Sequence, residues 1–156
     1  MADRFTVSWT DIACNVAAIP GKTIAQLTNP STQRIWIVEL LVTFDGTTAT
    51  AVPVNVRLAR QSSAGTPSGN TTPTPVQVDP GGPAALQTAV VAGSAAWTTE
   101  PTLTDILWTP RQPPTSGIGW QWPMGREPMI AASGRVGLVI AAAVSVNCTG
   151  HITWEA

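Results

Sequence analysis

The sequence predicts an all-β protein that forms one domain over residues 1–156. Fourteen prolines and thirteen glycines are scattered along the chain and leave little uninterrupted length for a helix. Between them, apolar and polar residues alternate with the period of two that half-buried strands require. A chain of 156 residues suits a single hydrophobic core and is too short for two ordinary domains.

Eight segments have the alternation and composition of strands. They are, in order, Lys22–Thr28, Arg34–Phe44, Ala51–Gln61, Leu86–Val91, Asp105–Arg111, Gly117–Pro123, Arg135–Ala143 and Val146–Glu155. The alternation is clearest from Val52 to Ala59. The segment Arg135–Ala143 also fits an amphipathic helix, but its valines and the neighbouring Gly134 and Gly137 favour a strand.

Two further segments lie outside these strands. Residues 1–20 are a possible N-terminal arm, in which Arg4–Trp9 is expected to form an arm or an edge strand. Residues 62–83 contain five prolines and are expected to form an extended, exposed loop that serves as a contact arm, with disorder as the alternative. Eight strands with one long loop suit an antiparallel β-sandwich of jelly-roll type, whereas a lipocalin-like barrel would have tighter, more regular hairpins.

The segment Arg34–Phe44 differs from the others because it is apolar on both faces. One face is formed by Trp36, Val38, Leu40, Val42 and Phe44. The other is formed by Ile35, Ile37 and Leu41, interrupted by Glu39. A strand of this kind is either central in a two-layer structure or covered by another subunit. We therefore expect Ile35, Ile37 and Leu41 to lie at a deeper layer or at a subunit interface.

Seven tryptophans and no tyrosine are an unusual aromatic composition. Trp120 and Trp122 are two residues apart and could form a platform for sugar rings. The favoured alternative is that both fill the core, together with Trp36, Trp108 and Trp154. Trp9 and Trp97 lie nearer to turns or edges, so they are expected to be exposed or interfacial.

The chain has few residues suited to catalysis. Its single histidine, His151, falls on the polar face of the last predicted strand, where an exposed histidine is usually inert. The sequence contains no nucleophile elbow, phosphate-binding loop or zinc-binding motif. Cys14 and Cys148 are expected to be buried free thiols, with a disulfide bridge as the alternative. We expect no enzyme activity, no cofactor and no metal.

Charged residues are scarce, and the composition and patterning of the chain argue against two classes of partner, nucleic acids and membranes. Only 11% of residues are charged, against about 25% in a typical soluble protein. A net charge of −1 argues against nucleic-acid binding, which needs a basic surface. No apolar run is long enough to span a membrane. The scarcity of charge indicates a surface of neutral polar residues, partly covered by other subunits.

Four stretches of the chain carry a family resemblance. They are Arg34–Gly46, Val54–Arg60, Gly134–Ile140 and the terminal Cys148–Glu155, which contains the sequence Trp-Glu. Together they resemble small proteins from the structural-gene regions of tailed bacteriophages that infect GC-rich bacteria. The likeness rests on strand order and covers about the final three quarters of the chain. It implies a virion-associated jelly roll of the capsid-decorating, cement-like type.

This resemblance implies a function in assembly. We expect an oligomeric capsid decoration protein that stabilises the shell by bridging capsomers. Its partners would be other copies of itself, a trimer above all, and the major capsid protein. It would be assembled in the bacterial host cytoplasm and located in the virion. The alternative is a carbohydrate- or receptor-binding module of a phage fibre or tail tip. A catalytic jelly roll of cupin type is disfavoured because one histidine cannot supply the usual metal ligands.

Overall fold

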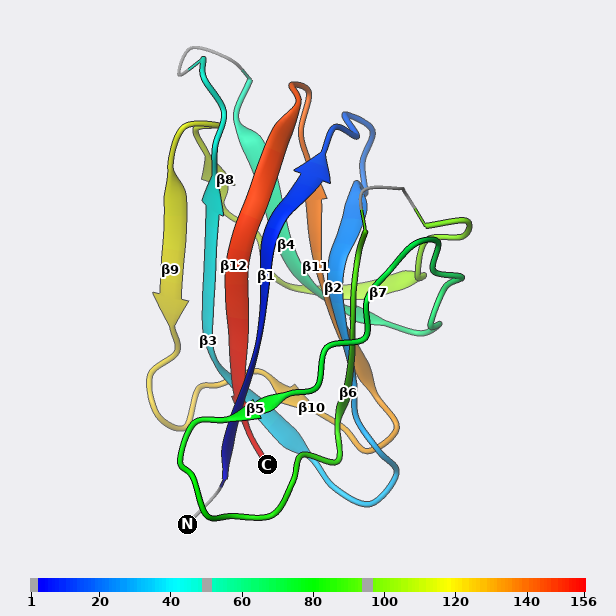
Figure 1. The fold of residues 1–156 in the computed structure, drawn as a ribbon, viewed down its shortest axis with the longest axis vertical. Helices are drawn as coiled ribbons and strands as arrows, with labels where there is room; N and C mark the ends of the chain where they lie inside the picture. The colour runs from blue at the N-terminus through cyan, green and yellow to red at the C-terminus, as the bar shows by residue number, and fades with distance from the viewer. Residues whose placement is uncertain (1–2, 49–51, 94–96) are drawn as a thin grey trace.

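The computed structural model describes residues 3–48, 52–93 and 97–156. In these ranges the chain forms twelve strands and no helix. The strands pair antiparallel in two sheets that pack face to face (Figure 1). The predicted all-β sandwich is therefore confirmed. No helix in the described ranges is long and apolar enough to cross a membrane.

The first sheet has the strand order β10-β3-β12-β1-β5, with β9 also paired to β3. Its strands are β1 (Arg4–Cys14), β3 (Ile35–Phe44), β5 (Val76–Gln77), β9 (Gly117–Gln121), β10 (Met129–Ile130) and β12 (Val146–Glu155). The second sheet has the order β6-β2-β11-β4-β7, with β8 also paired to β4. Its strands are β2 (Lys22–Thr28), β4 (Val54–Gln61), β6 (Thr88–Val91), β7 (Leu103–Trp108), β8 (Arg111–Gln112) and β11 (Arg135–Ala141).

All eight predicted segments overlap a strand, and the bounds of β2 and β12 agree with the prediction. The predicted number of eight is nevertheless too low for the described residues. The additional strands are β1 and the two-residue strands β5, β8 and β10. Two-residue strands lack the length needed to show a periodic pattern, so the sequence did not indicate them. Ala51, the predicted start of the third segment, lies outside the described residues.

The N-terminal segment is a strand of the sandwich over residues 4–14. β1 pairs with β12 along its whole length, apart from a bulge between Trp9 and Ile12. Its other edge is covered by β5 only at Phe5 and Thr6, so the rest of β1 is an edge strand. Phe5, Val7 and Trp9 are buried in the core. The expectation of an edge strand fits most of β1, whereas a free arm does not. Residues 1–2 of the possible arm lie outside the described residues.

Inward-facing residues of both sheets meet in one hydrophobic core. Trp154 of β12 is completely buried there, and its ring packs against that of Phe5. Opposite Trp9, β12 has Gly150, where a Cβ atom would collide with the backbone of Leu41 and press on the Trp9 ring. Glycine at this position lets the large indole approach the strand.

A β-bulge explains why β3 looked apolar on both faces. Glu39 pairs with Thr153, but Ile37 pairs with Trp154, so Val38 is an extra residue in β3. The bulge shifts the alternation by one position. As a result, the buried side chains on the two sides of the bulge all point to the core; they are Ile35, Ile37, Leu40, Val42 and Phe44. Of the two alternatives expected for Ile35 and Ile37, the structure therefore shows the deeper layer, because both are buried in the core of the chain itself.

The proline-rich loop is attached to both sheets. Thr66 forms a bridge with Thr99, and Thr71 forms one with Val91 at the end of β6. Further along, Val76–Gln77 forms β5 against β1 (Figure 1). Most residues from 62 to 83 are exposed or half-buried, in agreement with an extended surface loop. Its use as a contact arm stays a prediction.

The two cysteines are buried free thiols, as the sequence indicated. Both lie at the same end of neighbouring strands, because Ile12 pairs with Cys148 and Cys14 with Val146. A hydrogen bond with Cys148, together with burial, raises the pKa of the Cys14 thiol. A buried thiol that stays protonated is a poor nucleophile.

Candidate functional site

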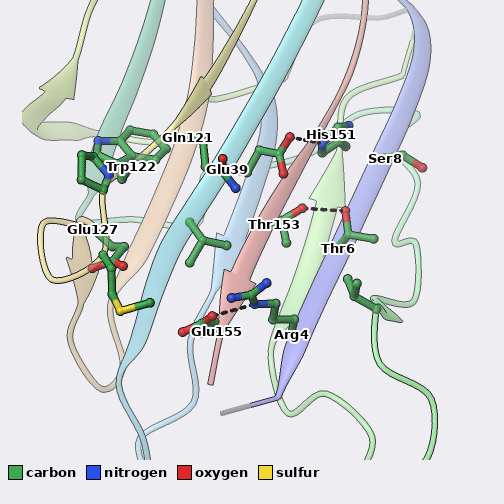
Figure 2. Close-up of a pocket in the computed structure, with 14 residues that line it drawn as sticks. Arg4, Thr6, Ser8, Glu39, Gln121, Trp122, Glu127, His151, Thr153 and Glu155 are labelled. Atoms are coloured by element: carbon green, nitrogen blue, oxygen red, sulfur yellow. Dashed lines mark hydrogen bonds and ion pairs between the residues drawn. The ribbon is translucent and has the colours of Figure 1, made fainter. Parts of the chain in front are cut away.

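A groove with a volume of about 690 Å³ lies on the outer face of the first sheet. Strands β1, β12 and β3 form its floor, and the connection from β9 to β10 forms one wall (Figure 2). On the opposite side, Val78 contributes from the segment after β5. This groove is the candidate functional site because it brings together polar side chains from four distant parts of the sequence.

Three cross-strand pairs of β1 and β12 form the floor. They are Arg4 with Glu155, Thr6 with Thr153, and Ser8 with His151. These residues lie on the groove side because alternate residues of a strand point to opposite faces. Phe5 and Val7 between them are buried in the core. The floor is therefore the polar half of two amphipathic strands.

The floor side chains are linked to one another (Figure 2). Arg4 Nε donates to Glu155 Oε1 at 2.6 Å, and this hydrogen bond raises the pKa of the guanidinium. Thr153 Oγ1 donates to Thr6 Oγ1 at 3.3 Å. These contacts limit the rotamers of the floor without covering it, so the groove is partly organised before any ligand arrives.

His151 of β12 lies beside the Glu39 carboxylate of the neighbouring strand β3 on the floor of the groove. Its Nε2 lies 3.6 Å from Glu39 Oε1, and both side chains are partly exposed. This contact is an ion pair only while the imidazole is protonated. The predicted position of His151 on the polar face is confirmed. Glu39 reaches the groove because the bulge at Val38 places it on the outer face.

The wall of the groove begins at the end of β9. The backbone N–H of Trp122 donates to the carbonyl of Val38 at 3.0 Å, which fixes the wall to the bulge of β3. Trp122 lines the groove and is partly buried against the core, and its ring packs edge-on against Trp108 of β7, with ring centroids 6.2 Å apart. Gln121 and Glu127 line the same wall, and Met124 at its tip is 93% exposed.

The charge of the groove is negative. Three carboxylates line it, from Glu39, Glu127 and Glu155, against one guanidinium from Arg4. Arg4 is already paired with Glu155, and Glu39 lies beside His151. Glu127 forms no ion pair with a described residue. In the described part of the chain, no group of three or more His, Cys, Asp or Glu residues could hold a metal ion.

The structure places the tryptophans differently from most expectations. Trp9 and Trp97, expected to be exposed, are only 4% and 5% exposed. The reason is that each indole N–H finds an internal acceptor, Cys148 Sγ for Trp9 and the Thr23 carbonyl for Trp97. Trp154 fills the core as expected, whereas Trp36, also expected inside, is 39% exposed.

Trp120 and Trp122 do not form a flat pair on the outer surface. Trp120 pairs with the inward-facing Leu40 across β9 and β3, so its ring extends toward the second sheet. There it packs on Trp108, with ring centroids 6.1 Å apart. The Trp120 residue is still 43% exposed, because β9 is an edge strand. Of the two residues, only Trp122 lines the groove.

Of the five residues expected at an interface, Leu41 alone is not buried by the chain itself. The groove residues on the other hand were missed, apart from His151 and Trp122. Their only signal was the polar alternation at Thr6 and Ser8 and again at Thr153. That pattern indicates an outer face but not which strands share it.

In comparisons with known proteins, no family model matches this chain. No curated protein and no solved structure matches it either.

Proposed function

We propose that this protein is a structural component of a bacteriophage virion, a decoration or cement protein that binds the capsid exterior as a homo-oligomer. Its mechanism would be mechanical. An oligomer, with a trimer as the expected form, would contact neighbouring copies of the major capsid protein and bridge capsomers. A protein that binds only the assembled shell stabilises that shell through mass action.

The proposal includes a jelly-roll topology, which is frequent in viral capsid proteins and lectins. The pairing of the longer strands supports it. β1 pairs with β12, β2 with β11, β3 with β9, and β4 with β7. These are the first and last, second and seventh, third and sixth, and fourth and fifth of eight long strands, once β6 and the two-residue strands are set aside. This nested order is that of a rolled-up ribbon.

The observation that best supports an assembly role is the unprotected edge strand β9. Within the described ranges it pairs with β3 alone, so the backbone groups along its other side have no strand partner. Isolated proteins usually protect such an edge with charged residues, prolines or bulges. β9 has the sequence Gly-Ile-Gly-Trp-Gln, which contains no charge and no proline.

The side chains along this edge are suited to a subunit contact. Trp120 is exposed over Trp108, and tryptophan is enriched at the energetic centres of protein interfaces. Gly117 and Gly119 pack closely on Thr43 and Leu41 of β3, so this edge carries few side chains of its own. The small proportion of charged residues, 11%, is consistent with a surface partly covered by partners.

The test compares two exposed tryptophans of similar accessibility. Trp120→Ser is expected to weaken self-association in analytical ultracentrifugation and to abolish co-sedimentation with capsids and their protection from heat. Trp36→Ser, on β3 where it pairs with Met129 of β10, is the matched control and is expected to retain all three. A purified wild-type protein that neither oligomerises nor binds or protects capsids would refute the assembly role.

A further inference from the structure

The groove on the outer face of the first sheet has the size of a small-molecule site. Its volume of about 690 Å³ falls within the range of about 300–1,000 Å³ typical of ligand pockets. The three cross-strand pairs of the floor extend from Arg4 to Ser8, a length of about 14 Å at the rise per residue of an extended strand. This length suits a short linear oligomer better than a compact metabolite.

The groove offers side-chain groups rather than backbone groups. Its floor is the face of a sheet, in which the β1 and β12 backbones already bond to each other. An extended peptide therefore finds no free strand edge between these two strands, and the free edge of β1 begins only beyond Thr6, at the border of the floor. Instead, Thr6, Ser8 and Thr153 contribute hydroxyls. Thr153 donates to Thr6 and Thr6 donates to the Ile152 carbonyl, so these two hydroxyls keep acceptor capacity, while the exposed Ser8 hydroxyl can both donate and accept. Sugar hydroxyls have this same dual character.

The wall supplies unused polar groups beside an aromatic ring. The side chains of Gln121 and Glu127 make no hydrogen bond to any other described residue. The Trp122 ring beside them is held by Trp108, so little ordering is needed when a ligand packs on it. Figure 2 shows Trp122 and Glu127 on one side of the groove, with Thr6 and Ser8 on the other. A flat apolar ring beside converging hydroxyl, amide and carboxylate groups matches a pyranose, which has apolar C–H faces and a polar rim.

Charge decides against anionic ligands. Phosphate, sulfate or an acidic sugar would face three carboxylates, while the single guanidinium of Arg4 is engaged with Glu155. A basic peptide fits the charge but makes little use of the hydroxyl floor, and between β1 and β12 it has no backbone edge to pair with. A neutral ligand rich in hydroxyls can contact the hydroxyl, amide and carboxylate groups of the groove as well as its aromatic residue, which a basic peptide does not do to the same extent.

We propose that this groove binds a neutral oligosaccharide of two to four sugar units, through stacking on Trp122 and hydrogen bonds to Gln121, Glu127 and the Thr6–Thr153 pair. The site lies on the outer face of the first sheet, whereas the assembly surface at β9 is an edge. Glycan binding therefore does not depend on the capsid role and would give the protein a second contact, with a carbohydrate surface.

The experiment is an NMR titration of the full chain with maltotriose, cellotriose, mannotriose and chitotriose, with sialyllactose and oligolysine as charged probes. At least one neutral trisaccharide is expected to shift the Trp122 indole and His151 signals, with a dissociation constant in the micromolar to millimolar range. Gln121→Ala, an exposed change that should leave the fold intact, and Trp122→Ala are each expected to weaken that binding about tenfold or more. Gln112→Ala, outside the groove, is the matched control.

Two results would overturn the proposal. One is that none of the four neutral trisaccharides perturbs groove residues in the wild-type protein at millimolar concentrations. The other is that oligolysine binds and the neutral sugars do not, which would assign the groove to a basic protein segment. Because the readout is a local signal of the isolated chain, either failure is distinct from a failure to bind capsids.

Discussion

A buried chain of hydrogen bonds links Trp154 to the loop that follows β2. The indole Nε1 of Trp154 donates to Gln87 Oε1 at 3.1 Å, and Gln87 Nε2 donates to Asn29 Oδ1 at 3.3 Å. The Asn29 amide donates in turn to the backbone carbonyls of Gln33, Ile130 and Ala131. Asn29 and Gln87 are each 2% exposed, so water cannot replace these partners.

Asn29→Ala is therefore expected to destabilise the protein by about 2–4 kcal/mol, because it leaves several buried polar groups without a partner. Urea unfolding followed by tryptophan fluorescence measures the change. Asn55→Ala is the control, since Asn55 makes a single exposed contact with Thr109. Equal losses for the two variants would contradict the importance of the buried chain.

Asp45 connects the end of β3 to the start of β12. Its carboxylate accepts from the backbone N–H of Asn147 at 2.6 Å and from the Asn147 side chain at 2.8 Å. These hydrogen bonds lower the pKa of Asp45 in the folded state. A carboxyl whose folded pKa lies below its unfolded value stabilises the fold above the unfolded pKa. That contribution is lost as the pH falls through the folded pKa.

Asp45→Ala should consequently lower the melting temperature at neutral pH, with a gap to the wild type that closes as the solution becomes acidic. The effect is expected to be small because the carboxylate is exposed to solvent. Thermal melts of both proteins between neutral and strongly acidic pH measure it. Asp79→Ala, at a carboxylate with no hydrogen bond to a described residue, should show no such convergence. A difference in melting temperature that is constant with pH would contradict a stabilising role for the ionised Asp45 carboxylate.

At the scale of the element, the bulge of β3 decides which side chains enter the core. Without it, Ile37 and Leu41 would lie on the same face, as the sequence suggested. With Val38 as the extra residue, Ile37 is completely buried and Leu41 points outward beside Gly119. The same bulge turns Glu39 toward the groove and gives Trp122 its backbone partner. One inserted residue thus organises both the core and the candidate site.

Ile37→Ala is expected to cost about 2–5 kcal/mol, the range for removing a buried aliphatic side chain. Leu41→Ala should cost less than about 1 kcal/mol because its side chain lies on the outer face. Denaturant unfolding of the two variants distinguishes them. A larger loss for Leu41→Ala would mean that the bulge is placed wrongly.

At the scale of the whole molecule, β1 completes the sandwich. As the first strand of the described chain it pairs with the last, β12, and it places Phe5, Val7 and Trp9 in the core. Burial of each such side chain contributes about 1.5–3 kcal/mol. Since small proteins are stable by only about 5–15 kcal/mol, the loss of all three would remove most of the stability.

Deletion of residues 1–14 should hence prevent folding, seen as a loss of the β signal in circular dichroism and aggregation in gel filtration. Replacement of the exposed residues 79–83 by a short glycine linker is the control and should leave the fold intact. A truncated protein that remained folded would restore the interpretation of this segment as a dispensable arm.

Local pattern was sufficient for the strands. Alternation of apolar and polar residues depends only on neighbours in the chain, so it located the strands longer than two residues other than β1, which was expected only as an arm or an edge strand, and it placed His151 on an outer face. It was insufficient where a bulge changed the alternation in β3, and it gave no information on two-residue strands. The tryptophans were also poorly predicted, because the depth of an indole depends on which acceptor and which neighbours the fold provides.

The amino-acid sequence by itself determined an all-β chain with polar outer faces and little charge, since these properties follow from composition and periodicity. Only the tertiary structure decided which outer faces meet. It brought Thr6 beside Thr153 and Glu39 beside His151, and it placed Trp122 from a separate loop in the wall of the same groove. Strand pairing between residues more than a hundred positions apart leaves no local pattern. The groove therefore became visible only when the sheet was assembled.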